Sequence, residues 1–593
     1  MPSANAYPGT GSRTIADLMG AASPRYAERP LVRHKVDGAW TDVSFAEVGV
    51  IVSEIGRGLI DLGLAPGERV AILAGTRPEW SYADFAVSSA GLVAVPIYPT
   101  NSPSECAWVL GNSEARAVIC EDAKQVAKVL EVREQLPALE HLIAFEPAPD
   151  AISLTDLRER GRGHAESELT ERAAAVGPAD PYTFIYTSGT TGPPKGCVLT
   201  HGNYRSIADM CIDIGVFDPE QPELTYLYLP LAHAFALLIQ LLSVELGGTI
   251  AYFSGDTRQI VPELAEIRPT YLPSVPRIFE KIYTLVTSGA DPRWLVRAVE
   301  VGGRVRDCKL AGDPVAEDIR AEFQQADELL FSKVRAAFGG RLRQAVTGAA
   351  PIAPEILRFF WACGVPVLEG YGMTETSTAA TYSTIEQHRW GTVGKALPGC
   401  EIKITQDGEI LLKGPNIFQG YYRNEDASFG AIEDGWMHTG DLGAIDADGY
   451  LSINGRKKDI IITAGGKNLT PANLENDMRQ SRWVSQAVMH GDRRPFPVML
   501  ITLDEEEIVP WAQAKGIEDT SVASLATQPA VHELIQAELD VANRGYAGVE
   551  QIKKFFILEH DLAQETGELT PTLKVKRNVV NEKYAERFDA LYG

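Results

Sequence analysis

Residues 182–196 read Tyr-Thr-Phe-Ile-Tyr-Thr-Ser-Gly-Thr-Thr-Gly-Pro-Pro-Lys-Gly. The first five are aromatic or β-branched, as in a buried strand, so the polar stretch after them is expected to leave the end of a strand. Its glycines let the backbone approach an anion closely, while its hydroxyls and Lys195 supply donors for phosphate oxygens. Open α/β sheets bind ligands at such strand ends. The stretch therefore predicts a phosphate-binding loop in an α/β fold.

This loop differs from the P-loop of nucleoside triphosphatases. Lys195 is followed by Gly196, where that motif has a serine or threonine for Mg²⁺, so a metal ligand is expected from elsewhere in the chain. A solvated Gly/Ser/Thr linker is the alternative. The two prolines before the lysine and the strand before the loop favour a shaped loop instead.

The composition predicts a soluble, cytoplasmic protein with more than one domain. A chain of 593 residues is too long for one core, and 45% apolar with 23% charged residues is typical of globular proteins. The net charge of −24 disfavours nucleic acid as a partner. Seven widely spaced cysteines indicate reduced thiols. A leader is not expected, since the first residues carry no basic region followed by an apolar core, and there is no run of about 18 apolar residues. Peripheral membrane association and the oligomeric state are left open.

Strand and helix patterns alternate along most of the chain. A hairpin is expected at residues 31–41 and a helix capped by Ser44 at 44–63, followed by strands near 69–74, 93–97 and 117–120 with helices between them. This alternation predicts a mostly parallel sheet covered by helices. A helix is expected at 201–213, a charged helical surface insertion at 277–340 and a small β subdomain at 408–460. A mixed module of strands and helices follows the basic run Arg456-Lys457-Lys458.

A second cluster, residues 368–376, reads Leu-Glu-Gly-Tyr-Gly-Met-Thr-Glu-Thr. Tyr371 offers an aromatic face to a nucleobase, Thr374 a hydroxyl to a phosphate and Glu375 a hard oxygen to Mg²⁺. In isolation Glu375 would be interpreted as a carboxylate at a helix start. Just upstream, residues 346–351 form a strand pattern running into a turn of small residues. A flat ring has room against such a backbone, and a simple turn is the alternative.

Two further positions fit a nucleotide and an acyl chain. Asp441 follows a glycine turn and is suited to accept hydrogen bonds from both ribose hydroxyls, with an ordinary turn residue as the alternative. His233 has the small neighbours Ala232, Ala234 and Ala236, which leave room for an apolar tunnel. A core histidine is the alternative there.

The loop at 186–196 and the segment 371–375 closely resemble signature motifs of the adenylate-forming superfamily, which comprises acyl-CoA synthetases, peptide-synthetase adenylation domains and luciferases. The resemblance covers roughly residues 40–580, and the helical insertion before Val346 is similar to that of the long-chain fatty acyl-CoA synthetases. It implies an α/β fold with a large N-terminal domain of stacked α/β sheets and a small β subdomain, residues 1–457. It also implies a smaller, mobile α+β C-terminal domain, residues 458–593, that rotates about Lys458.

The resemblance also implies roles for individual residues. Leu573 stands where a glycine usually precedes the catalytic lysine, so Lys576 is the alternative to Lys574. The implied catalytic residues are Lys574, Lys195, Glu375, Thr374 and His233. Mg²⁺ would be held by Glu375 and Thr187. The glycines at 465–466 would line a pantetheine tunnel. The residues implied to bind ATP or CoA are Thr187, Ser188, Gly189, Thr190, Thr191, Gly192, Gly348, Ala349, Ala350, Tyr371, Gly372, Asp441, Arg456, Lys458, Gly465 and Gly466.

The activity implied by the resemblance is that of an ATP-dependent long-chain fatty acid:CoA ligase. The fatty carboxylate would attack the α-phosphate of ATP, with Mg²⁺ as cofactor, to give acyl-AMP and pyrophosphate. CoA would then displace AMP to give the thioester. The alternatives are a fatty acyl-AMP ligase that delivers to a separate carrier protein, and a nucleotide- or acyl-binding protein without turnover. Retention of Lys195, Glu375, Asp441 and Lys574 weighs against the last, because simple binding does not need all four.

Overall fold

The computed structural model describes residues 9–187, 193–217, 221–570 and 574–593. Its first large sheet has eight strands, of which β8, β4, β3, β5, β6 and β7 are parallel, as the alternating pattern predicts. The strands in spatial order are β19 (Gly420–Tyr421), β9 (Lys195–Thr200), β8 (Pro181–Thr187), β4 (Val93–Ile97), β3 (Arg69–Leu73), β5 (Ala117–Cys120), β6 (His141–Ala144) and β7 (Ile152–Ser153).

The connection after β8 differs from the sequence expectation. The loop was expected to lead to the helix at 201–213, but β9 intervenes and pairs antiparallel with β8, with Thr187 opposite Lys195. Lys195 is therefore the first residue of a strand and not part of the loop. The pattern Lys-Gly-Cys-Val-Leu-Thr of β9 is too short to stand out from a loop exit, and its pairing with β19 gives it a second neighbour.

The second large sheet has nine strands and also contains a parallel core, β14, β13, β12, β10, β11 and β1. The predicted hairpin is its edge, with β1 antiparallel to β2. The strands in spatial order are β16 (Lys395–Ala396), β15 (Thr381–Tyr382), β14 (Val367–Tyr371), β13 (Gln344–Thr347), β12 (Tyr271–Ser274), β10 (Leu224–Leu227), β11 (Thr249–Tyr252), β1 (Pro30–Val36) and β2 (Ala39–Ser44).

Helices cover both faces of both sheets, because alternate side chains of the parallel strands are buried on either side. In β3, Val70 and Ile72 join the core shared with the second sheet, whereas Ala71 and Leu73 join a core on the opposite face. The helices are α1 (Leu18–Arg25), α2 (Phe45–Asp61), α3 (Pro78–Ser89), α4 (Pro103–Ser113), α5 (Ala123–Glu131), α6 (Leu154–Gly163), α7 (Glu166–Ala175), α8 (His201–Asp213), α9 (Ala234–Leu246), α10 (Ile260–Ile267), α11 (Pro276–Thr287), α12 (Pro292–Ala311), α13 (Glu317–Ala326), α14 (Ser332–Ala337) and α15 (Pro354–Cys363).

Two of these helices show how local sequence sets the fold. Ser44 caps α2 as predicted, since its hydroxyl accepts from the Glu47 N–H at 3.2 Å and the Glu47 carboxylate accepts from the Ser44 N–H at 2.8 Å. Helix α9 is apolar except for Gln240, Ser243 and Glu245, and every residue but Phe235 is buried. A helix of that composition belongs inside a core, and α9 packs within the core that the two sheets share.

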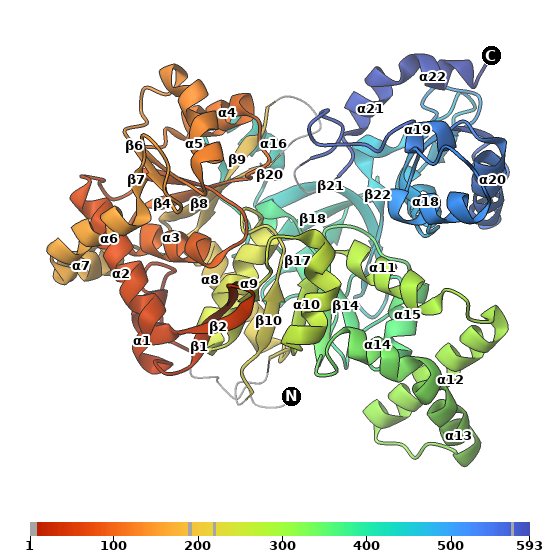
Figure 1. Cartoon of the computed structure of the whole chain (residues 1–593), viewed down its shortest axis with the longest axis horizontal. Coiled ribbons are helices and arrows are strands. Elements are labelled where there is room, and N and C mark those ends of the chain that lie inside the picture. Colours follow the sequence, from red (N-terminus) through yellow and green to blue (C-terminus); the bar gives the residue numbers. More distant parts are fainter. Residues whose placement is uncertain (1–8, 188–192, 218–220, 571–573) are drawn as a thin grey trace.

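The predicted surface insertion is only partly at the surface. Helices α12 and α13 extend away from the sheets (Figure 1, lower right), as expected for a charged pair. The segment after α13 passes through a π-helical turn, residues 327–331, into α14, and its apolar side chains Phe331, Val334 and Phe338 are fully buried against the second sheet. That half of the insertion is therefore core, because its apolar residues face α10, α11 and α15.

Residues 401–456 form the predicted small β subdomain, an antiparallel five-stranded sheet. Its strands are β17 (Glu401–Ile404), β18 (Glu409–Lys413), β20 (Ile432–Glu433), β21 (Trp436–Ile445) and β22 (Leu451–Arg456), with α16 (Glu425–Ala431) between β19 and β20. Helix η5, Lys457–Asp459, follows β22. The domain boundary expected between residues 457 and 458 falls within η5 and stays a prediction.

The chain after η5 packs around cores of its own, and it lies at the upper right of Figure 1. A three-stranded sheet separates the two cores. The three strands of this sheet are β25, β26 and β27. The elements of the chain after η5 are β23 (Ile461–Ile462), β24 (Asn468–Leu469), α17 (Pro471–Arg479), β25 (Val484–His490), β26 (Val498–Leu503), α18 (Glu505–Ala514), α19 (Val522–Leu525), α20 (Pro529–Asn543), β27 (Lys554–Ile557), α21 (Arg577–Lys583) and α22 (Ala585–Ala590). We call residues 458–593 the C-terminal module.

All seven cysteines are free, and five of them are buried, as the wide spacing indicates. Among the described residues, no helix combines the length and the apolar character needed to cross a membrane.

Candidate functional site

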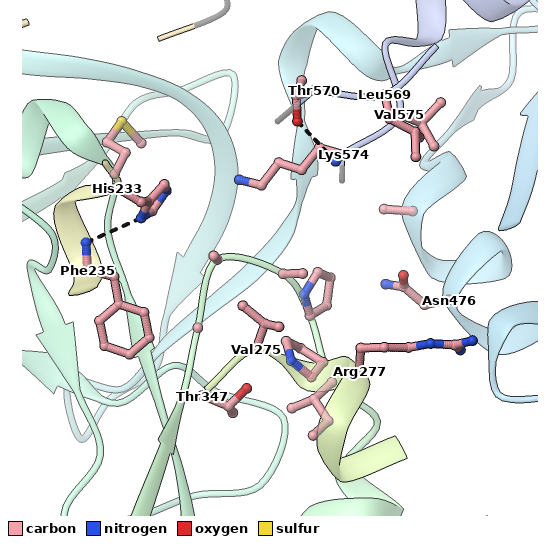
Figure 2. A pocket seen from close by; sticks show the side chains of 18 of the residues that line it. His233, Phe235, Val275, Arg277, Thr347, Asn476, Leu569, Thr570, Lys574 and Val575 are labelled. Atoms are coloured by element: carbon pink, nitrogen blue, oxygen red, sulfur yellow. Dashed lines mark hydrogen bonds between the residues drawn. The ribbon is translucent and has the colours of Figure 1, made fainter. Parts of the chain in front are cut away.

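One cavity of about 2940 Å³ lies where the C-terminal module meets the rest of the chain. Ordinary small-molecule sites occupy about 300–1,000 Å³, so this cavity has room for several ligand groups at once. Its walls come from the end of β8, the starts of β9 and α9, the ends of β12, β13 and β14, the β21–β22 pair and residues 569–570 and 574–577. Figure 2 shows the part between His233, Thr347 and Lys574.

Asp441 is the centre of one polar cluster in this cavity. The Tyr371 phenol donates to Asp441 Oδ2 at 2.8 Å, and Arg456 Nε donates to Asp441 Oδ1 at 2.9 Å. Burial disfavours the charge on Arg456, but the Asp441 carboxylate outweighs it and raises the pKa of the guanidinium. Each carboxylate oxygen has a second lone pair, so Asp441 can still accept from the two hydroxyls of a ribose.

Glu375 is the centre of a second polar cluster. The Tyr421 phenol donates to Glu375 Oε1 at 2.8 Å, and the Lys195 ammonium lies 5.0 Å from the centre of the Tyr421 ring. The strand pairings cause this arrangement, because β9 carries Lys195 and pairs with β19, which carries Tyr421. Burial and then the nearby Glu375 charge raise the pKa of the Tyr421 phenol far above its ordinary value, so it stays a donor.

Thr187 and Glu375 both line the cavity and both lie beside Cys197. The Cys197 thiol lies 3.8 Å from Thr187 Oγ1, and burial, followed by the Glu375 charge, raises the pKa of that thiol. Mg²⁺ is bound in proteins by one or two carboxylates together with substrate phosphates and water. A hydroxyl and one carboxylate at this wall fit that donor set, although the described residues contain no cluster of three or more metal-ligating side chains.

His233 and Lys574 face each other across the cavity (Figure 2). His233 caps α9, and its Nδ1 accepts from the Phe235 N–H at 3.2 Å, which places the proton of the neutral ring on Nε2. Burial, and then the Lys574 charge, lowers the pKa of His233 to about 4, so the ring is neutral at physiological pH. His233 therefore offers an N–H donor to an oxygen in the cavity.

The Lys574 ammonium lies within electrostatic reach of both polar clusters. Its side chain is exposed to the cavity, yet protein surrounds it on most sides. Burial lowers the pKa of Lys574, Arg456 lowers it further, and Asp441 and Glu375 oppose that shift. Two hydrogen bonds hold the Lys574 backbone, since its N–H donates to Thr570 Oγ1 at 3.0 Å and its carbonyl accepts from the Thr570 N–H at 2.8 Å.

Lys576 occupies a different place from Lys574. It caps α21, and its N–H donates to the Glu568 carbonyl at 2.7 Å. Of the two lysines, Lys574 is the one whose charge acts on His233. The position therefore favours Lys574 over Lys576 as the lysine that contacts the reacting groups, an assignment that stays a prediction. Leu573 lies outside the described residues.

The small-residue segment after β13 also lines the cavity as predicted. The residues concerned are Gly348, Ala349 and Ala350, and Tyr371 and Gly372 line the same cavity. A Cβ on Gly348 would stand 3.0 Å from the Gly370 carbonyl, and one on Gly372 would stand 2.3 Å from the Thr378 carbonyl. Ala349 has a φ of +67°, a strained value for alanine. The backbone is thus bare at the place where the sequence predicts the adenine.

Several predicted residues have other positions. Gly465 and Gly466 are exposed in the turn between β23 and β24 and do not line the cavity, whereas Lys458 does. Thr374 is buried at the start of η4 (Thr374–Thr376) and lines the cavity. Ser188, Gly189, Thr190, Thr191 and Gly192, the centre of the predicted phosphate loop, lie outside the described residues.

Sequence reasoning missed two residues at this site, Tyr421 and Glu369. Tyr421 reaches Glu375 only through the β9–β19 pairing, for which no local motif exists. Glu369 follows two buried residues of β14 and lines the cavity, and its carboxylate has no hydrogen-bond or ion-pair partner among the described residues. Burial raises the pKa of Glu369 to about 8. An acidic residue inside an otherwise apolar strand was the available signal for it.

An apolar branch of the cavity runs along α9 away from His233. It is lined on one side by α9 and on the other by Tyr271 and Tyr382, in strands of the second sheet, and by Tyr228, which directly follows β10. Leu242 lies nine residues after His233, which corresponds to about 13 Å along a helix. The phenol of Tyr382 accepts a hydrogen bond from Gln344 Nε2 at 2.8 Å, so a polar pair stands beside the deep part of an apolar branch.

The sequence matches the model of AMP-binding enzymes over residues 21–422 and the model of the AMP-binding enzyme C-terminal domain over residues 458–593. The chain belongs to the AMP-binding enzyme family, which confirms the predicted superfamily. It is 41% identical over 568 residues to the long-chain-fatty-acid–CoA ligase FadD15 of Mycobacterium bovis, covering 94% of this chain and 93% of that protein. It is 34% identical to a long-chain-fatty-acid–CoA ligase of Gallus gallus, covering 98% and 81%.

The fold is similar to solved structures of adenylate-forming enzymes. The adenylation domain of a carboxylate reductase from Mycobacterium chelonae superposes with a TM-score of 0.76 at 20% identity, covering 98% of this chain and 92% of that one. An anthranilate CoA ligase in complex with anthranoyl-AMP gives a TM-score of 0.72 at 20% identity, covering 96% and 97%. These similarities confirm the α/β fold with a large N-terminal and a smaller C-terminal part.

Proposed function

We propose that this chain is an ATP-dependent long-chain fatty acid:CoA ligase that forms an acyl-AMP intermediate, releases pyrophosphate and then transfers the acyl group to CoA. The observation that carries the proposal is the convergence of Lys574, Glu375, Asp441 and His233 on one cavity with an apolar branch. The names of the relatives at 41% and 34% identity support the same substrate class.

Each residue of the cavity would have its own role in the first half-reaction, according to its position. Asp441 would accept from the ribose hydroxyls, and the bare backbone at Gly348 with Tyr371 would receive the adenine. The neutral His233 would donate from Nε2 to the carboxylate or an α-phosphate oxygen. Lys574 would bridge the carboxylate and the α-phosphate and stabilise the negative charge that grows on the phosphorus as the new C–O–P link forms and pyrophosphate leaves.

Mg²⁺ fits the wall at Thr187 and Glu375, and it would neutralise phosphate charge there during the displacement. Lys195 stands at the same wall and would contribute a second positive charge near the phosphates. The Tyr421 hydrogen bond would hold Glu375 Oε1 in place and leave Oε2 for the ion.

The second half-reaction requires a different face of the C-terminal module. Here Lys574 faces the cavity while Gly465 and Gly466 lie outside it, so a CoA thiol would need those glycines to replace Lys574. We infer that the module turns about Lys458 between the two steps, since one small module cannot present both faces at once.

The proposal is tested by acid-dependent ATP–pyrophosphate exchange over a series of chain lengths, run beside a thioester assay with CoA. Exchange together with CoA thioester is the expected result. Exchange without CoA thioester would identify the alternative enzyme, a fatty acyl-AMP ligase with a separate carrier. Binding of ATP without exchange would identify a non-catalytic protein.

A further inference from the structure

Helix α11 presents a charged face to the C-terminal module. Arg277, Glu280, Lys281 and Thr284 follow one another at helical spacing, and all four line the cleft between the two parts. Arg277 Nη2 lies 2.7 Å from Asp504 Oδ2, and Lys281 Nζ lies 2.5 Å from Glu506 Oε2. Figure 2 shows the Arg277 side chain extending from α11 toward the module.

The ion pairs of Arg277 and Lys281 connect the two parts of the chain. In the part of the chain that the structure describes, they are the two ion pairs that join residues 1–457 to residues 458–593. Lys457, which precedes the expected pivot, pairs with Asp407 and Glu409, and all three belong to residues 1–457. Arg277 and Lys281 instead hold a point of the module that lies well away from the pivot in sequence.

Local helix chemistry does not explain the basic partners. Asp504 caps α18 and Glu506 lies in its first turn, where acids are favoured by the helix dipole in any case. Arg277, however, lies in the first turn of α11, where a cation is disfavoured and no acidic residue stands, and among the described residues its ion pair is with Asp504 rather than with Glu280 of its own helix. The partner that compensates Arg277 is on the C-terminal module.

The centre of the same face is complementary as well. Burial raises the pKa of the Glu280 carboxyl, and the positive charges of Arg479 on α17 and of Arg277 oppose that shift. The charged groups of α11 are thus each opposite a group of the other sign on the module. Arg277, Glu280 and Lys281 are opposite Asp504, Arg479 and Glu506, respectively. Such alternation specifies one docking orientation, since a different orientation would bring like charges together.

We propose that Arg277 and Lys281 are positioning residues that hold the C-terminal module in the orientation in which Lys574 faces the cavity, and so favour acyl-AMP formation over thioester formation. The inference rests on the proposed function. Asp504, Glu506 and Lys574 belong to one folded module. A rotation of the module that brings Gly465 to the cavity therefore moves Asp504 and Glu506 away from α11 and Lys574 out of the cavity at the same time. Breaking the ion pairs should therefore shift the balance between the two orientations.

The test measures both half-reactions separately in the full-length protein, with palmitate for ATP–pyrophosphate exchange and with supplied palmitoyl-AMP plus CoA for thioester formation. In R277D and K281E the exchange rate should fall about two- to fivefold, as expected for losing exposed ion pairs, while the thioester rate is kept or rises. The charge-swapped pairs R277D/D504R and K281E/E506K should recover exchange.

A matched control is R297E, which breaks the Arg297–Glu322 pair, 2.7 Å, between α12 and α13 and leaves the α11 face intact. Its ratio of exchange to thioester rate should equal that of the unmodified protein. If a charge-reversed variant fails to fold, R277Q and K281Q replace it, and their ratio of exchange rate to thioester rate is compared with that of the unmodified protein.

Three outcomes would overturn the inference: both half-reactions falling by the same factor, swapped pairs that are as slow as the single variants, or a control that changes the ratio as much as R277D does. Failure of the proposed function looks different, since the unmodified protein would then lack exchange or thioester formation altogether.

Discussion

The phenol of Tyr421 in β19 donates a 2.8 Å hydrogen bond to Glu375 Oε1 in η4, although the two residues lie 46 positions apart in the chain. The bond fixes one carboxylate oxygen of a residue that lines the cavity. It also places an aromatic ring beside the Lys195 ammonium, at 5.0 Å. A carboxylate, a hydroxyl donor and a cation are thus assembled from β9, β19 and η4 at the wall where the phosphates of ATP are expected.

The first prediction concerns this carboxylate. Glu375→Ala should reduce ATP–pyrophosphate exchange by roughly two to three orders of magnitude, the usual scale for removing one group that stabilises a transition state electrostatically. Tyr421→Phe, which keeps the carboxylate and removes only its hydrogen bond, should lose much less. Near-normal exchange in Glu375→Ala would refute the Mg²⁺ assignment.

The second prediction separates the two faces of the C-terminal module. Lys574→Ala should abolish acyl-AMP formation but still convert supplied acyl-AMP and CoA to thioester, because the charge it removes serves only the first step. Lys458→Pro should do the reverse, since proline restricts φ at the pivot. If both variants lose both half-reactions equally while staying folded, the module is a fixed lid.

The third prediction concerns the acyl chain. Saturated or monounsaturated acids of roughly twelve to eighteen carbons should be preferred, since each buried CH₂ contributes about 0.8 kcal/mol until the branch ends. Leu242→Trp, which narrows the branch about 13 Å from His233 along α9, should shift the optimum to shorter acids and leave ATP binding unchanged. An optimum at acetate or an aromatic acid in the unmodified protein would contradict this assignment.

The fourth prediction concerns the pKa of Glu369, which burial raises to about 8. The folded protein then binds this proton more tightly than the unfolded chain does. Glu369 should therefore lower the free energy of unfolding progressively as pH rises from about 4.5 to about 8, by a few kcal/mol at most. Glu369→Gln should remove that slope and unfold at a higher temperature near pH 8, with little difference near pH 4.5. Thermal unfolding across this pH range measures it, and parallel curves for the two proteins would show that Glu369 is not held neutral.

The sequence by itself determined the local helices and strands and the residue types from which the fold class and the function were predicted. Alternating strand and helix patterns indicate the parallel sheets because each pattern depends on neighbours along the chain. The Ser44 cap and the hairpin at β1–β2 follow from residues within a few positions of each other. The motifs around Lys195, Tyr371 and Glu375 could be recognised from the sequence because contact with a ligand restricts which residue types can stand at neighbouring positions of a loop.

Only the tertiary structure decided which of those residues share a cavity and which face of each element meets it. The strand at Lys195, the Tyr421–Glu375 bond and the unpartnered Glu369 arise from strand pairings between segments far apart in the chain, and such pairings leave no local pattern. The division of the helical insertion between core and surface depends on the helices that cover it. The orientation that places Lys574 in the cavity and Gly465 outside it is set by contacts across the cleft, such as Arg277 with Asp504, which become visible only when the two parts are brought together.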